Sequence, residues 1–291
     1  MEFNLGILFA LGALICWGFG DFNLQKLIRK LGDWETLLII TLFGWVVLTP
    51  FVYKDLSFLF SFQDNSFLIL MIAAIVISIA ALLDFEALKQ GKLAIVEPVL
   101  ALEVPVSLVL SIFIIKETIG ILQLILIFVL ILGLILVSLK SKHLLRKNWI
   151  ERGVLVALLG ALFMGSSNFL VGFASRVTNP LLTNWFINMF MALLSLSYLI
   201  LNRRFKKIIR DVNKNKKLTF SVCFLDNGAW ILFAFSMSLI PIAIAVAVSE
   251  SYIALAALLG LVINKEYLMR HQKIGLFISL VSAIVLAVIS S

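Results

Sequence analysis

Apolar residues fall along the chain in ten blocks, each about as long as a membrane-spanning helix, with short polar segments between them. A helix needs about 20 consecutive apolar residues to cross the hydrocarbon layer of a bilayer. Backbone polar groups in lipid must pair within their own segment, so each block is expected to be an α-helix. The pattern therefore predicts spans near 5–26, 34–53, 66–88, 93–115, 119–139, 152–174, 181–201, 218–239, 241–263 and 273–290.

The composition supports an integral membrane protein. Of the 291 residues, 62% are hydrophobic and only 14% are charged. A soluble domain of this size carries roughly a quarter charged residues, so this chain cannot build a surface that faces water all round. We expect an all-α membrane protein with ten transmembrane helices, located in the cytoplasmic (plasma) membrane.

The two halves of the chain are related in sequence. Shifts of 147 and 149 residues bring small, polar and aromatic positions into register. The matches include Gly6 with Gly153, Ala10 with Ala157, Gly18 with Gly165, Phe22 with Phe169, and Lys116-Glu117 with Lys265-Glu266. Self-similarity of this kind indicates duplication. It predicts a first five-helix repeat at 1–141, a basic linker at 142–150 and a second repeat at 151–291.

Five spans is an odd number, so the second repeat must cross the membrane in the opposite orientation to the first. The odd-numbered connections, including the central linker, hold 21 of the 24 Lys and Arg residues, and eight of these lie in 202–217. Positively charged connections favour the cytoplasmic side. The charges therefore predict two inverted five-helix repeats with both termini outside. They also account for the net charge of +8 without a nucleic-acid partner.

Few residues are suited to metal binding or catalysis. Cys16 and Cys223 lie in separate apolar blocks, and His143 and His271 lie in or beside charged loops. A structural zinc site needs about four converging ligands. The sequence also shows no pairing of a nucleophile with a base. We expect no metal site, no catalytic residue, no cofactor and no enzymatic activity.

Small residues in the first and sixth spans, and polar residues near the ends of the fourth and ninth, follow a common layout. They are Gly12, Trp17, Gly18, Gly160, Gly165, Pro105, Glu117, Gln123, Glu266, Gln272 and Gly275. This layout resembles the drug/metabolite transporter (DMT) superfamily, specifically the EamA-type proteins with two five-helix repeats. The resemblance implies alternating access around a central cavity lined by the first, third and fourth helices of each half. Family members carry amino acids, amines, sugars or nucleotide-sugars, and many are described with both termini cytoplasmic.

Acidic side chains inside the predicted spans are the strongest functional candidates. They are Asp21, Asp84, Glu86, Glu97, Glu103, Asp226 and Glu250. Each ionised side chain costs about 2.5–3.5 kcal/mol at the bilayer centre. The sequence places no Lys or Arg at the depth of Glu103, Asp226 or Glu250, which fall near the centres of their spans. We expect these three to face a wet cavity, to be protonated or to await a cation, and so to lie on a transport pathway.

Aromatic residues share helix faces with two of these acids. Trp17 and Asp21 are four residues apart, as are Asp226 and Trp230, and positions i and i+4 lie on one face of a helix. A ring beside a carboxylate suits an ammonium group, because ion pairing is combined with a cation–π attraction of about 2 kcal/mol when desolvated. These pairs predict a site for a cationic or zwitterionic amine.

The internal repeat adds two further candidates. Tyr252 aligns with Glu103 of the first half and lies two residues from Glu250, and Asn168 aligns with Asp21. The candidate substrate-binding or coupling residues are therefore Glu103, Asp226, Glu250, Trp17, Asp21, Trp230, Tyr252 and Asn168. Structural explanations stay open for Trp17 and Trp230, which are also suited to packing between helices. Asp21, near the end of its span, is equally suited to reaching the headgroups.

Other polar residues are better explained by structure. Asp84 and Glu86 lie one turn from lysines, which favours interfacial ion pairs over substrate contact. Glu97 precedes a proline and is suited to stabilising a broken helix. Asn184 and Asn188 share a helix face, and hydrogen bonding between helices explains them adequately. The repeated Lys-Glu pair that ends the fourth and ninth spans predicts a solvated turn.

Together these features predict a secondary transporter that moves a small organic metabolite, with a cationic or zwitterionic amine favoured. One alternative is proton-coupled export of aromatic or neutral amino acids, in which the acids bind only the proton. A second alternative is a lipid-flippase component, for which membrane lipid replaces the soluble substrate. The oligomeric state stays open between a monomer and a homodimer.

Overall fold

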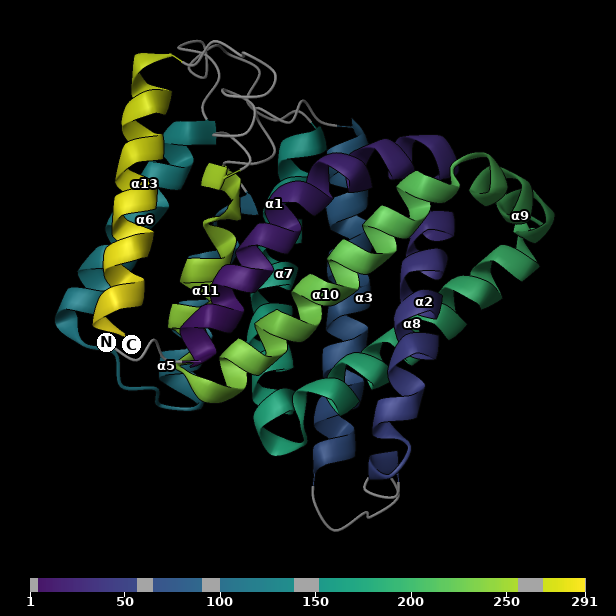
Figure 1. Ribbon diagram of the computed structural model, residues 1–291, viewed down its shortest axis with the longest axis horizontal. Coiled ribbons are helices and arrows are strands. Elements are labelled where there is room, and N and C mark those ends of the chain that lie inside the picture. The colour runs from purple at the N-terminus through teal and green to yellow at the C-terminus, as the bar shows by residue number, and fades with distance from the viewer. Residues whose placement is uncertain (1–4, 57–64, 91–99, 139–151, 256–268, 291) are drawn as a thin grey trace.

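The computed structural model describes residues 5–56, 65–90, 100–138, 152–255 and 269–290, and its regular elements there are helices (Figure 1). They are α1 (Leu5–Leu31), α2 (Asp33–Val52), α3 (Ser66–Gln90), α5 (Glu103–Ile114), α6 (Ile121–Ser138), α7 (Arg152–Val177), α8 (Pro180–Leu201), α9 (Phe205–Lys214), α10 (Lys216–Leu239), α11 (Ile242–Glu250) and α13 (Arg270–Ile289). The predicted all-α fold class is confirmed.

Six of these helices are long and apolar enough to cross a membrane. The helix α1 also meets this condition when its two segments, Leu5–Gly20 and Asn23–Leu31, which are bent by 48°, are counted as one span. Shorter apolar helices occupy the fourth, fifth and ninth predicted spans. Residues 91–99 and 256–268 lie outside the described residues, and they include parts of the fourth and ninth predicted spans. The described helices agree with the predicted pattern of about ten spans.

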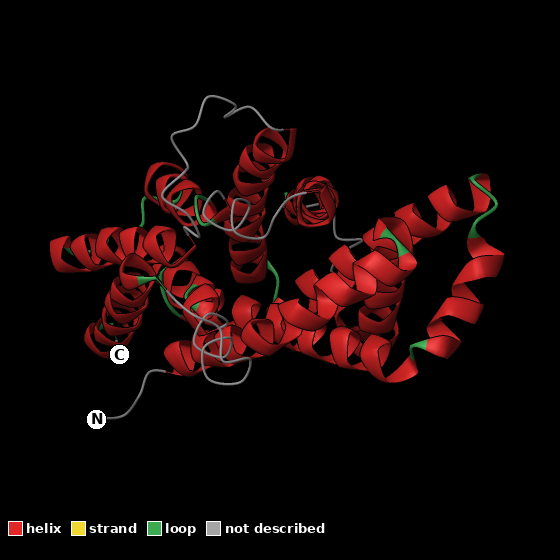
Figure 2. Cartoon of the chain, turned by 90° about the horizontal axis from the view of Figure 1, so that it is seen from above, coloured by secondary structure: helices red, strands yellow, loops and turns green. Residues whose placement is uncertain are grey.

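Both chain termini lie at one end of the bundle, as an even number of spans requires (Figures 1 and 2). The helix α9 lies at the edge of the bundle farthest from them in both views. The sequence predicted only a polar connection over 202–217, so this ten-residue helix is a finding of the structure. Ile208 of α9 is buried against Leu38, Ala192 and Leu199, so an apolar face holds the basic segment on the bundle.

The main helix contacts join one half of the chain to the other. The helices α1 and α7 are the first spans of the two halves, and α3 and α10 are the third spans. The helix α1 packs on α10, and in the corresponding way α7 packs on α3. The packing of α1 on α11 corresponds in the same way to that of α7 on α5. The pairs α2 with α8 and α6 with α13 each join equivalent helices. This is the pairing expected of an internal pseudo-twofold axis.

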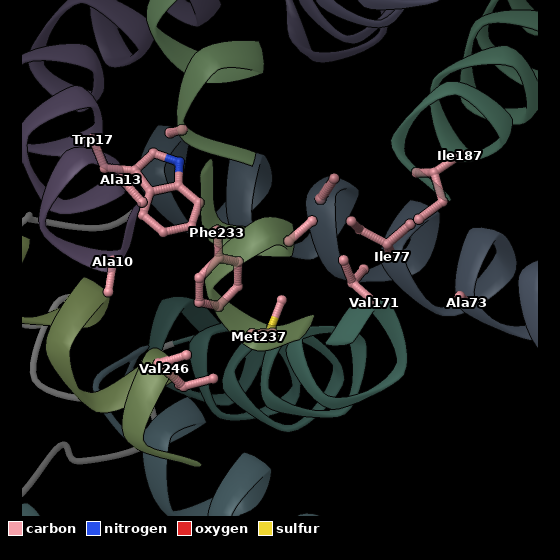
Figure 3. Close-up of a cluster of buried hydrophobic side chains, with 14 of the residues drawn as sticks. Ala10, Ala13, Trp17, Ala73, Ile77, Val171, Ile187, Phe233, Met237 and Val246 are labelled. Carbon is pink, nitrogen blue, oxygen red and sulfur yellow. The ribbon is translucent and has the colours of Figure 1, made fainter. Parts of the chain in front are cut away.

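Buried apolar side chains fill the centre of the bundle between its helices. Figure 3 shows Trp17 of α1, Ile77 of α3, Val171 of α7, Ile187 of α8 and Phe233 of α10 gathered in one cluster. The outer surface is also apolar. It exposes large side chains that include Leu5, Phe51, Phe113, Ile121, Phe128, Phe224 and Phe277. An apolar exterior around a packed interior is what contact with lipid tails requires.

Candidate substrate cavity

A cavity of about 130 Å³ lies inside the bundle, and eight helices contribute to its lining: α1, α2, α3, α5, α7, α8, α10 and α11. Seven of the eight candidates from the sequence line it, namely Glu103, Asp226, Glu250, Trp17, Trp230, Tyr252 and Asn168. The eighth, Asp21, lies in α1 where that helix bends, and its side chain is outside the described residues. The structure thus brings together side chains from both halves, and their roles stay predictions.

Aromatic rings form one wall of the cavity. The Trp17 ring centroid lies 5.4 Å from that of Trp230 and 6.0 Å from that of Tyr252. Phe233 packs edge-on behind both tryptophans, 5.1 Å from Trp17 and 5.8 Å from Trp230. Edge-to-face pairs at this spacing are favourable and restrain each ring. The rings of Trp17 and Trp230 therefore pack between helices and also line the cavity, and their role in binding a substrate stays a prediction.

Glu103 is positioned by a close crossing of α5 and α7. It is the first residue of α5, and the positive end of that helix dipole stabilises a carboxylate in the first turn. Asn168 Nδ2 donates a hydrogen bond to Glu103 Oε2 at 3.3 Å, and both residues are buried. Three residues before Asn168, Gly165 permits this contact, because a Cβ there would lie only 2.5 Å from the Glu103 carbonyl oxygen.

Glu250 has the opposite helix environment. It is the last residue of α11 and is only 4% exposed. The C-terminal end of a helix carries partial negative charge, so a carboxylate there is destabilised unless a proton or a cation neutralises it. Tyr252, two residues further on, lines the same cavity. A positive charge in the cavity would therefore stabilise the Glu250 carboxylate.

A set of side-chain amides lies on α8 and α10. Asn184 Nδ2 donates to the Pro180 and Trp230 carbonyl oxygens, at 2.9 and 3.4 Å. Asn188 Nδ2 donates to Asn227 Oδ1 at 3.2 Å. The predicted hydrogen bonding between helices is thus present, but Asn184 and Asn188 also line the cavity, which the sequence did not predict.

Glu117 is not part of a solvated turn, so that prediction is wrong for the first repeat. Its side chain is 8% exposed and lies 2.7 Å from Arg176 Nη2. Glu117 Oε1 also accepts from the Ile242 N–H at 2.8 Å, at the start of α11. Arg176 in turn donates to the Met237 and Ile240 carbonyl oxygens, at 2.8 and 2.7 Å. One ion pair therefore joins the segment after α5 to the ends of α7 and α10 and to α11. The equivalent Glu266 is outside the described residues.

The model of the EamA-like transporter family matches the chain twice, over residues 4–139 and 151–288. The chain belongs to this family. Its members are membrane transporters of the DMT type rather than enzymes, and the protein is an integral, multi-pass membrane protein.

The fold of this EamA-like transporter is also found among solved structures. One crystal structure of a protein matches with a TM-score of 0.75 and 13% sequence identity. The match covers 98% of this chain and 97% of that one. At this identity the likeness shows the fold alone. No curated protein matches the transporter significantly.

Two further residues of the transporter bear on the predictions for its acids. Asp84 lines the cavity, although its spacing from lysines favoured an interfacial ion pair. Glu97 lies outside the described residues. For Asn184 and Asn188, the one signal in the sequence was their four-residue spacing, which places both amides on one face of α8.

Proposed function

We propose that this protein is a secondary transporter that carries a small organic amine across the plasma membrane by alternating access. One observation supports this above all. The ionisable side chains of the described cavity lining are Asp84, Glu103, Asp226, Glu250 and Tyr252, so every fully charged group among them is an anion. Aromatic rings stand beside them.

An ammonium group matches this lining for two physical reasons. Hydrogen bonds between an ammonium and a carboxylate are charge-assisted, and are roughly twice as strong as neutral ones. The faces of Trp17, Trp230 and Tyr252 add cation–π attraction, which reaches about 2 kcal/mol per contact when desolvated. A cation would also offset the unfavourable position of the Glu250 carboxylate at the end of α11.

Alternating access is supported by the exchange of helix pairs between the halves. When one half is exchanged for the other, α1 on α10 becomes α7 on α3, and α1 on α11 becomes α7 on α5. An inverted repeat of this kind offers two related arrangements that open to opposite faces of the membrane around one central site. Glu103 lies on α5 and Glu250 lies on α11, and these two helices are the equivalent fourth spans of the two halves.

The aromatic wall favours a second candidate, proton-coupled export of aromatic or neutral amino acids. An apolar or aromatic substrate side chain would pack against Trp17 and Trp230, while the acids would carry only the proton. The carboxylates would then be needed for coupling but not for recognition of the solute.

Thermal unfolding of the purified protein with a panel of solutes distinguishes the two candidates. We expect choline-like amines or polyamines to raise the melting temperature by several degrees, because a ligand at 100 times its Kd stabilises by about 2.7 kcal/mol. Neutral amino acids at the same concentration should have little effect. Glu103→Gln should abolish the shift, whereas Glu86→Gln, an acid of α3 outside the described lining, should keep it. Stabilisation by amino acids alone would support the second candidate, and stabilisation by lipids alone would contradict both.

A further inference from the structure

Asn184 and Asn188 form what we call the amide pole of the cavity, and Glu103 and Glu250 form its acid pole. The amide pole stands on α8, which packs on α2, α3, α7 and α10. The acid pole stands on α5 and α11, which pack on one another. All four side chains line one cavity. A ligand in it therefore meets two walls of different chemistry, with Asp226 and Trp230 of α10 also in the lining.

The orientation of the Asn188 amide follows from the residue behind it. Asn227 Nδ2 donates to the Ile40 and Cys223 carbonyl oxygens, at 3.0 and 2.9 Å. These two bonds use both N–H donors of Asn227, so the atom that it turns to Asn188 is its Oδ1 acceptor. Asn188 must therefore face it with its nitrogen. Gly44 of α2 makes room for this contact, because a Cβ there would lie 1.9 Å from Asn227 Oδ1.

Asn184 is oriented by the same reasoning. Its two N–H donors are used by the carbonyl oxygens of Pro180 and Trp230. Asn184 consequently keeps its carbonyl oxygen for a ligand, and Asn188 keeps its carbonyl oxygen and one N–H; in the described part of the chain no donor is paired with either oxygen. The amide pole is thus a neutral surface that offers two acceptor oxygens and one N–H donor.

We infer that the amine carried by this transporter bears a second N–H donor group at its far end, as a linear diamine does; this inference rests on the proposed function. One ammonium binds the carboxylates of the acid pole. The other donates to the amide oxygens of Asn184 and Asn188, in charge-assisted hydrogen bonds. The aromatic wall contacts the methylene chain between them.

The same chemistry discriminates against related solutes. A monoamine of equal length leaves the amide pole without a donor, so it forgoes the hydrogen bonds at that end. An amino acid of equal length places a carboxylate against the two acceptor oxygens, and only the remaining N–H of Asn188 can donate to it. We therefore expect the order of affinity to be diamine, then monoamine, then amino acid.

Titration calorimetry on the purified full-length protein tests this order with 1,4-diaminobutane, butylamine and 4-aminobutanoate. The diamine should bind at least about tenfold more tightly than butylamine, the change expected from even one of its two charge-assisted hydrogen bonds to the amide oxygens. The amino acid should bind more weakly than either. In Asn188→Ala, and separately in Asn184→Ala, the ratio of diamine to butylamine affinity should fall toward one. Two variants are used because either substitution alone is able to disturb folding.

The outcomes separate this inference from the proposed function. If butylamine and the diamine bind the wild-type protein equally, the inference is wrong and the proposed amine transporter stands. If the diamine is preferred but neither asparagine variant changes the ratio, the assignment to the amide pole is wrong. If no amine binds at all, the proposed function fails and the inference fails with it.

Discussion

Arg176→Met is expected to lower the free energy of unfolding by about 2–3 kcal/mol and to remove most transport. Loss of one partner from a buried ion pair typically costs about 3–5 kcal/mol, and the 30% exposure of Arg176 reduces that figure. The substitution also removes the donors that hold the Met237 and Ile240 carbonyl oxygens at the end of α10. Transport should fall because Glu117, which accepts from the Ile242 N–H at the start of α11, loses its ion pair with α7, and α11 carries Glu250.

The matched control for this variant is Arg204→Met. Arg204 pairs with the buried Glu35 only at 3.8 Å and its own side chain is 57% exposed, so the loss should be smaller than that for Arg176. Thermal unfolding of both variants in the same detergent provides the comparison. Equal melting temperatures for the two would show that the Glu117–Arg176 pair has no special structural role.

Gly165→Ala is expected to cause the second-largest change, a destabilisation of about 1–2 kcal/mol together with a marked loss of amine binding. Alanine gains about 1 kcal/mol of helix propensity over glycine, which acts in the opposite direction. The new Cβ would meet the Glu103 carbonyl oxygen at 2.5 Å and the Val106 Cβ at 2.7 Å. Backbone cannot move aside as a side chain does, so α5 must shift and overpacking dominates. That shift separates Glu103 from Asn168.

Gly160→Ala, on the same helix, is the control. A Cβ there would find its nearest neighbour, Leu100 Cδ2, at 3.6 Å, which is an ordinary contact. This variant should be neutral, or more stable by up to about 1 kcal/mol. Thermal unfolding and amine titration of the two variants decide the matter, and a Gly165→Ala protein as stable as Gly160→Ala would rule out a close crossing of α5 and α7.

The spans of this protein could be predicted from its sequence because lipid imposes a simple length rule. The predicted span at 34–53 corresponds to α2 (Asp33–Val52), and the one at 181–201 to α8 (Pro180–Leu201). The helix α9 was missed because the span pattern identifies only long apolar segments, and α9 is short and basic. Its apolar residues are too few to cross a membrane, but Ile208 is buried against the bundle.

The cavity could be predicted only as far as local spacing reaches. The four-residue spacing of Asp226 and Trp230 placed both on one face, but their proximity to Trp17 depends on α1 packing on α10. Contacts such as Glu117 with Arg176 join residues far apart in the sequence. Helices come into contact where small residues such as Gly165 allow close packing. The hydropathy of a segment does not show which other helix will pack there.

Solute counterflow in proteoliposomes is the most direct test of whether the cavity carboxylates carry an amine across the membrane. Wild-type protein should accelerate uptake of a labelled amine against a preloaded amine. Glu250→Gln and Asp226→Asn should each abolish the acceleration, although the purified variants unfold at temperatures near that of the wild type. Uptake that both substitutions leave unchanged would contradict the account.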